Sequence, residues 1–306
     1  MIQYNTRTAV IKRLVSIRQP DWATKAAQRT DEHETAGRYI KKDEILADGT
    51  KAKDFWGDVK SVFITVQCGK CAYCEAKPES SAIQWDVEHF RPKSDVDEWE
   101  LPGPGNPEYL RRHFHRKPGS ARWEYHIPTG PAMTKGYYLL AYDLENYAIC
   151  CKTCNTIYKR AYFPVQNARV SIGKSVVDYK LEGAYLIYPL GDQREDPEQD
   201  IAFDDVQAVA KNGSVRGQLI IDFFDLNREG LQRSRAEWLV HTVYNVYEGF
   251  SQGRQKAIKT MEWLLSYKAP FTNCTRCFVN LCLNDSGEAE RRYSKMEKIL
   301  LKSPRI

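Results

Sequence analysis

Residues 85–93, which read W-D-V-E-H-F-R-P-K, bring together side chains that can do chemistry. Asp86 and Glu88 offer the hard oxygen ligands that divalent ions prefer, and His89 offers an imidazole that can accept a proton near neutral pH. Two cations follow within four residues and can meet a phosphate. Together these groups suit metal-assisted attack on a phosphodiester. The alternative interpretation is a solvated strand end that carries a surface histidine.

The two cations are Arg91 and Lys93, and the residue between them controls the backbone. Pro92 has no amide hydrogen to donate, so neither a strand ladder nor a helix continues regularly through it. His89 is therefore expected at the end of an extended segment. Arg91 and Lys93 are expected to contact the phosphate groups of a nucleic acid.

Residues 95–136 carry six prolines and are predicted to form an insertion rather than a separate core. Within them lies a basic segment, R-R-H-F-H-R-K, which begins with Arg111 and Arg112. Such cations bind a nucleic-acid backbone without reading its sequence, because they displace its counterions. The alternative is the solvent-exposed face of a short helix.

Nine cysteines fall in three clusters, and the N-terminal residues lack the apolar core of a secretory signal. We therefore expect a reducing compartment, where thiols serve metals or catalysis. Two distant C-x-x-C pairs predict a structural zinc held by Cys71, Cys74, Cys151 and Cys154. Four thiolates leave no open position on the ion, so this zinc would hold the fold and perform no hydrolysis. Cys68 and Cys150 are alternative members of these clusters.

The third cluster, Cys274, Cys277 and Cys282, has three thiols and no obvious fourth ligand. His241 is a conceivable candidate, but a lone histidine between valine and threonine is more often an ordinary helix residue. We therefore interpret these three cysteines as buried helix residues.

Length and charge set broad limits on the protein. The chain has 306 residues, 42% of them hydrophobic, which is enough for one large domain or two moderate ones. Its formal charge of +5 permits a polyanionic partner without demanding one. No run of 18 apolar residues occurs, so we expect a cytoplasmic protein without membrane contact. We predict a helical region over 1–67, a core over 68–164, and a small β region followed by helices over 165–306. Within the core, Pro164 is expected to end the helix that carries Asn155 and Lys159. Residues 184–216 are expected to be strand-like.

The order of these motifs resembles the HNH endonuclease family. The matching residues are Cys71-Ala-Tyr-Cys74, Val-Glu88-His89-Phe-Arg-Pro-Lys, Asn146, and Cys151-Lys-Thr-Cys154-Asn155 with Lys159. The resemblance implies an α+β fold, with a ββα-metal core and a four-cysteine zinc embedded in a largely helical protein. It covers residues 68–164.

The resemblance also implies roles for single residues. His89 would be the general base that takes a proton from the attacking water. Glu88 matches the acidic metal ligand of the family but is one methylene longer than the commoner Asp, so either Glu88 or Asp86 is the expected ligand. Asn146 would hold the histidine strand and orient the imidazole.

Two residues of the last motif complete the implied site. Asn155 stands where the final histidine of the family often lies and would give the metal an oxygen. Lys159 would stabilise the charge that develops on the phosphate. The ion would be Mg²⁺, or Mn²⁺ in its place. In contrast to the compact family core, 56 residues separate His89 from Asn146, so residues 95–136 are expected to loop out.

Further similarities extend over residues 55–240. The segments G-Y-Y-L-L-A-Y-D-L-E-N, F-P-V, D-P-E-Q-D-I-A-F-D and L-N-R-E-G-L-Q-R-S-R are similar to the HNH partners of ATPases in Septu-type and retron-linked phage defence. This resemblance implies a DNA-cleaving defence effector with an ATPase partner. The alternatives are a zinc-stapled nucleic-acid-binding or adaptor protein without cleavage activity, and an RNase toxin of the same family.

Overall fold

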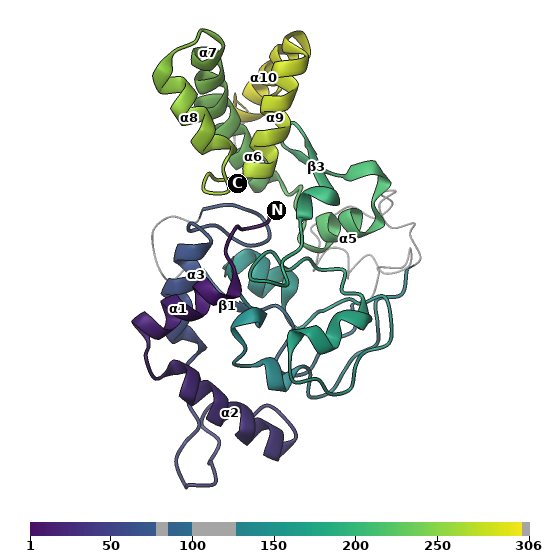
Figure 1. Cartoon of the computed structure of the whole chain (residues 1–306). Helices are drawn as coiled ribbons and strands as arrows, with labels where there is room; N and C mark the ends of the chain where they lie inside the picture. Colours follow the sequence, from purple (N-terminus) through teal and green to yellow (C-terminus); the bar gives the residue numbers. More distant parts are fainter. Residues whose placement is uncertain (78–84, 100–126, 302–306) are drawn as a thin grey trace. The chain divides into compact units, whose positions relative to one another are not determined.

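The computed structural model describes residues 1–77, 85–99 and 127–301, which separate into two compact units (Figure 1). Unit 1 comprises residues 1–3, 70–77 and 196–306, and unit 2 comprises residues 4–69 and 78–195. The three-part division predicted from the sequence partitions the chain differently and stays a prediction. Within the described ranges, every helix is too short or too polar to cross a membrane.

Unit 2 is built from short helices around one hairpin. Its α-helices and strands are α1 (Thr8–Arg18), α2 (Trp22–Ala36), α3 (Lys60–Val66), β1 (Trp85–His89) and β2 (Tyr147–Cys151). Its 3-10 and π turns are η1 (Trp56–Val59), η4 (Tyr138–Leu140), η5 (Leu144–Asn146), η6 (Thr153–Lys159) and η7 (Val176–Glu182).

The strands β1 and β2 pair antiparallel, with His89 opposite Tyr147. Helix α3 packs against both strands, which explains why the apolar run of β2 is buried along almost its whole length. Gln67, directly after α3, accepts a hydrogen bond from the Ile149 amide at 2.6 Å and donates one to its carbonyl at 3.0 Å. The end of α3 thereby fixes the position of β2.

A seven-residue π-helix, η6, follows β2 after one residue. It ends at Arg160, whose backbone leaves the helical region with a positive φ of 45° and a ψ of −131°. The helix predicted to run to Pro164 is therefore shorter than expected. Its buried side chains include Cys154 and Lys159. Single π-helical turns of this kind occur often at functional sites.

Unit 1 is mainly helical and contains a second hairpin. Its strands and helices are β3 (Ile201–Asp204), β4 (Gln207–Ala210), α5 (Val215–Phe223), α6 (Glu229–Trp238), α7 (Asn245–Ser251), α8 (Gln255–Leu265), α9 (Thr272–Asn284) and α10 (Ser286–Leu301). Shorter turns are η8 (Pro197–Gln199), η9 (Lys211–Gly213) and η10 (Leu239–Tyr244). Helices α5 and α9 pack on the hairpin.

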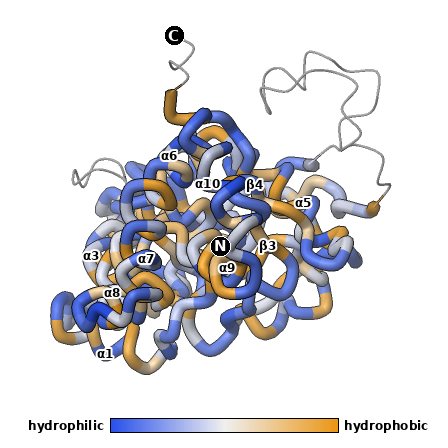
Figure 2. Tube along the Cα trace, turned by 90° about the horizontal axis from the view of Figure 1, so that it is seen from above, coloured by the Kyte–Doolittle hydropathy of each residue, from blue (hydrophilic) through white to orange (hydrophobic). Residues whose placement is uncertain are grey.

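Helices α8, α9 and α10 of unit 1 are amphipathic, and hydrophobic residues alternate with hydrophilic ones along them (Figure 2). In α8, for example, Met261 and Leu264 are buried whereas Lys259 and Glu262 are exposed.

Residues 184–216 are less regular than the sequence predicts. Strands β3 and β4 lie within this segment, but the apolar run at 185–190 is buried without forming a strand. In place of a strand partner, the Tyr188 hydroxyl donates to the Tyr147 carbonyl at 2.9 Å. Apolar content alone does not distinguish a buried irregular segment from a strand.

Candidate functional site

His89 stands at the end of β1 and is 8% exposed. Its Nε2 lies 3.0 Å from the Ala141 carbonyl. Because a carbonyl only accepts hydrogen bonds, this contact places the imidazole proton on Nε2 and leaves the lone pair on Nδ1. Nδ1 is therefore the atom that can take up a proton.

The protonation state of His89 agrees with that function. Burial lowers the pKa of His89 well below its usual value, and the nearby charges of Lys93 and Lys159 lower it further. The Ala141 hydrogen bond acts in the opposite direction but does not reverse the shift. At neutral pH the imidazole is therefore neutral, and its Nδ1 carries an unprotonated lone pair.

The Asn146 side chain fixes the backbone that follows His89. It forms what we call a clip, since it bonds to both the amide and the carbonyl of one residue, Arg91. The Asn146 side-chain oxygen accepts from the Arg91 amide at 2.8 Å, and its side-chain nitrogen donates to the carbonyls of Arg91 and Leu140 at 3.0 and 3.1 Å. The Asn146 carbonyl accepts from the Phe90 amide at 2.8 Å. Asn146 is fully buried, so these bonds hold the end of β1 in one position.

The acidic residues of β1 meet the π-helix η6. The Lys159 ammonium lies 3.1 Å from a Glu88 oxygen, and both side chains are buried. Burial raises the pKa of Glu88, although the charge of Lys159 opposes this shift. The Asn155 amide donates to Asp86 at 3.2 Å.

Strand geometry separates the acidic residues from the histidine. Side chains alternate between the two faces of a strand, so Asp86 and Glu88 share one face and His89 takes the other. The contacts agree, because Glu88 meets Lys159 of η6 whereas the His89 ring meets the rings of Trp56 and Tyr147. The direct contacts of Glu88 and His89 thus differ, although the charges of Lys93 and Lys159 act on both side chains.

Asp86, Glu88 and Asn155 fit a hard divalent ion by the chemistry of their donors. Two carboxylates and an amide oxygen are the ligand types that Mg²⁺ and Mn²⁺ prefer. The ammonium of Lys159 already compensates the charge of Glu88, so an ion bound to Glu88 would displace it. Asp86 is partly exposed and has a neutral partner in Asn155.

The cations predicted to contact phosphate differ in how deeply the structure buries them. Arg91 is 6% exposed, lies 3.6 Å from Glu182, and has its guanidinium 4.8 Å from the centre of the Phe163 ring. This burial favours a structural role for Arg91 over the predicted phosphate contact. Lys93 is partly exposed. Arg111 and Arg112 lie outside the described residues.

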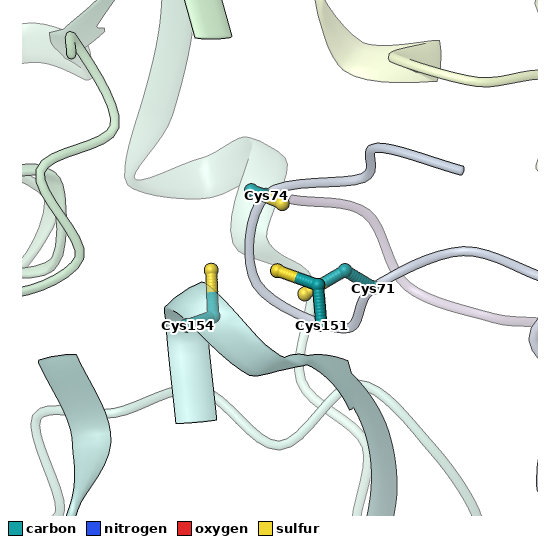
Figure 3. Close-up of side chains that lie close together, drawn as sticks. All are labelled: Cys71, Cys74, Cys151 and Cys154. Atoms are coloured by element: carbon teal, nitrogen blue, oxygen red, sulfur yellow. The ribbon is translucent and has the colours of Figure 1, made fainter. Parts of the chain in front are cut away.

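The structure brings together the four cysteines that the spacing selects. The sulfur atoms of Cys71, Cys74, Cys151 and Cys154 all lie within 4.8 Å of one another and turn toward a common centre (Figure 3). Zn–S bonds of about 2.3 Å require tetrahedral sulfurs about 3.8 Å apart, so this group can hold a metal ion. Among the described residues it is the only group of three or more His, Cys, Asp or Glu side chains close enough to share an ion. Cys68 and Cys150 are not members.

The local backbone shapes this cluster. The Glu75 amide donates to the Cys71 carbonyl at 3.1 Å, and the Cys71 amide donates to the Ala76 carbonyl at 3.0 Å. Glu75 has a left-handed φ of 61°, which closes the turn that carries Cys71 and Cys74. Cys154 comes from η6.

The third cluster consists of Cys274, Cys277 and Cys282. The Cys274 thiol donates to the Asp205 carbonyl at 3.2 Å, and burial raises the pKa of this thiol. Cys274 and Cys282 are buried and Cys277 partly so. All three lie in α9, which confirms their interpretation as helix residues.

Two contributors to the site escape sequence reasoning. The Ala141 carbonyl fixes the tautomer of His89, but a backbone group leaves no signal in the sequence. The Trp56 ring meets the His89 ring edge-on with centroids 5.2 Å apart. Trp56 lies within residues 55–66, where apolar side chains from Phe55 to Val66 recur at helical spacing, and an aromatic residue there is most simply explained by core packing.

The chain is similar to a known protein over part of its length. Over 180 residues it is 28% identical to the Septu protein PtuB of Bacillus mycoides (strain KBAB4). The alignment covers 58% of this chain and 50% of that protein, so the chain spans about half the length of this curated relative. No protein-family model and no solved structure matches the chain.

Proposed function

We propose that the protein is a metal-dependent HNH-type endonuclease that hydrolyses phosphodiester bonds of DNA. The observation that carries this proposal is the neutral His89, with its proton fixed on Nε2, at the end of a hairpin that Asn146 clips. The π-helix after this hairpin brings Asn155 and Lys159 to the acidic residues of β1. This arrangement supports a ββα-metal core.

In this proposal His89 removes the proton of the attacking water through Nδ1, and Asn146 keeps the end of its strand in place. Asp86, Glu88 and Asn155 would hold a Mg²⁺ or Mn²⁺ ion, which supplies charge stabilisation for the phosphate when bound. Lys159 moves its charge from Glu88 toward the phosphate. The four cysteines would hold a structural Zn²⁺.

The biological setting follows from the relative and from the resemblance. Similarity to a Septu protein supports a role as an anti-phage defence effector. The resemblance to HNH partners of ATPases supports an ATPase as the protein partner. Because the chain matches only half of the relative, both statements belong to the proposal.

A second candidate is a nucleic-acid-binding or adaptor protein without cleavage activity. The burial of His89 and the pairing of Glu88 with Lys159 favour it, because in this arrangement neither side chain is open to a substrate. The endonuclease requires these side chains to become accessible when the substrate or the partner binds.

Cleavage of supercoiled plasmid distinguishes the two candidates. Wild type with Mg²⁺ or Mn²⁺, with and without the partner ATPase, should nick the plasmid, and EDTA should prevent nicking. The His89→Ala variant should be at least 100-fold slower, since general base catalysis contributes about 10²–10⁴-fold. The matched control His241→Ala, an exposed histidine of η10, should cut within about twofold of wild type.

Equal cutting by His89→Ala and wild type would contradict the assigned base. Retention of plasmid on a gel without nicking, with every metal and with the ATPase present, would favour the binding protein. Faster cleavage of a single-stranded RNA than of DNA would identify an RNase.

A further inference from the structure

Trp56 is the partly exposed neighbour of the buried His89. Two rings contact the imidazole edge-on, those of Trp56 and Tyr147, with centroid distances of 5.2 and 5.1 Å. Tyr147 is fully buried, and its hydroxyl donates to the Ala141 carbonyl at 2.6 Å, so its position is fixed. Trp56 is therefore the ring beside His89 that a substrate can reach.

Lys93 rests on the same indole. Its ammonium lies 4.5 Å from the centre of the Trp56 ring and 5.2 Å from that of Tyr39. Tyr39 is itself held, since its hydroxyl donates to Asp54 at 2.5 Å. In the part of the chain that the structure describes, no carboxylate lies within ion-pair distance of Lys93, although the charges of Asp54 and Glu88 act on it from farther away. Lys93 is thus a cation held by aromatic faces.

Such a cation has a better partner in a phosphate. A charge-assisted hydrogen bond to a phosphate oxygen is stronger and more directional than the attraction of an ammonium to a ring face. When Lys93 turns to a phosphate, it uncovers the indole face that it occupied. An uncovered, partly exposed indole is the platform on which an unpaired base stacks.

We propose that Trp56 and Lys93 form a nucleotide clamp beside His89, in which Lys93 binds a backbone phosphate and Trp56 stacks on the adjacent base. This proposal rests on the proposed function and names its substrate class. A base that stacks on Trp56 has left its own duplex stack, so the preferred substrate is DNA with unpaired nucleotides. Trp56 determines this preference, and Lys93 contributes affinity for any strand.

Binding measured without cleavage tests the clamp. The background variant is His89→Gln, which keeps the bulk of the side chain next to Trp56. Fluorescence polarisation compares a labelled 20-nucleotide oligo-dT with a duplex of the same length. The background variant should bind oligo-dT at least about tenfold more tightly than the duplex, because stacking on Trp56 adds to binding only for unpaired bases.

Four further substitutions, each added to the background, separate the two contacts. Trp56→Leu should weaken binding of oligo-dT about tenfold and that of the duplex less than twofold, whereas Trp56→Phe should stay within threefold because it keeps a stacking ring. Lys93→Met should weaken both and reduce the salt dependence of binding by about one charge. Trp263→Leu is the matched control, since Trp263 is 41% exposed and has the Lys77 ammonium 6.0 Å from its ring centre. It should change neither affinity.

Several results would overturn the clamp. These are equal affinity for oligo-dT and duplex, equal loss on both substrates in Trp56→Leu, or a loss in Trp263→Leu as large as that in Trp56→Leu. Tighter binding of oligo-U RNA than of oligo-dT would overturn the choice of DNA. Thermal unfolding checks that each variant folds, and Trp56→Phe and Lys93→Met keep the test valid if Trp56→Leu does not.

The outcomes also separate the clamp from the endonuclease. Plasmid nicking by wild type with no effect of Trp56 on binding would refute the clamp and leave the proposed function standing. Binding of oligo-dT that depends on Trp56, without nicking under any condition, would support the clamp and contradict the endonuclease.

Discussion

Each of the two units contains an antiparallel hairpin that one asparagine side chain clips. In unit 2, Asn146 bonds to both the amide and the carbonyl of Arg91, at 2.8 and 3.0 Å. In unit 1, Asn227 bonds in the same way to Ala208, at 2.7 and 2.8 Å. The same amide device therefore serves two hairpins.

The hairpins differ in what their strands carry and in how they are connected. Strands β3 and β4 are joined by Asp205 and Val206 alone, and the charges at this turn pair with Arg292 and Lys295 near the surface. Strands β1 and β2 are separated by residues 90–146 and bury His89. An asparagine clip is thus a structural device, and chemistry depends on the side chains that it positions.

The largest expected difference is in zinc content and stability, and it compares Cys154, which follows β2, with Cys274, which lies beside the second hairpin. If the four cysteines hold zinc as proposed, Cys154→Ser should abolish zinc binding and strongly destabilise η6, because a structural zinc contributes on the order of 10 kcal/mol. The matched variant Cys274→Ser should keep about one zinc per chain, since the Cys274 thiol donates to a carbonyl beside the second hairpin. Elemental analysis and thermal unfolding measure both effects. Full zinc content in Cys154→Ser would contradict the assignment of Cys154 as a zinc ligand.

Acid should destabilise unit 2 through His33. Burial lowers the pKa of His33 to about 4, against about 6.5 in an unfolded chain. The unfolded chain therefore takes up a proton first, and the stability of unit 2 should fall by about 3 kcal/mol as the pH falls from 6.5 to 4. Among its described residues, unit 1 contains no buried histidine.

Hydrogen exchange of peptides from each unit at pH 7 and pH 4 measures this effect, with His33→Phe as the variant that cannot titrate. Other groups also titrate in this range, so the decisive quantity is the difference between wild type and His33→Phe. An identical loss of protection in both proteins would show that His33 does not control the acid response of unit 2.

The smallest expected effect comes from the direct comparison of the two asparagine clips, Asn146 and Asn227. Asn146→Ala should lower nicking activity about 10- to 100-fold, the usual cost of removing a group that orients a site. Asn227→Ala should leave activity within about twofold of wild type. Both variants should lose a comparable amount of thermal stability, because each leaves a backbone amide and carbonyl without a partner. Equal activities in the two variants would show that the clip in unit 2 has only a structural role.

Features that depend on residues close together in the chain could be predicted from the sequence. The C-x-x-C spacing selected the four cysteines that come together, because two residues between thiols allow both to reach one ion. Pro92 correctly indicated that β1 ends near His89. Long-range features were less accessible, as the buried irregular segment at 185–190 and the early end of η6 illustrate.

By itself, the sequence determined which residue types stand close together along the chain, and so the imidazole, the carboxylates, the amides and the thiols of the candidate site. Only the tertiary structure decided their surroundings. It turned Glu88 toward Lys159 and His89 toward Trp56, and it buried Arg91 among aromatic rings. The physical reason is that strand alternation, burial and the backbone carbonyl at Ala141 depend on segments far apart in sequence, which meet only when the chain folds.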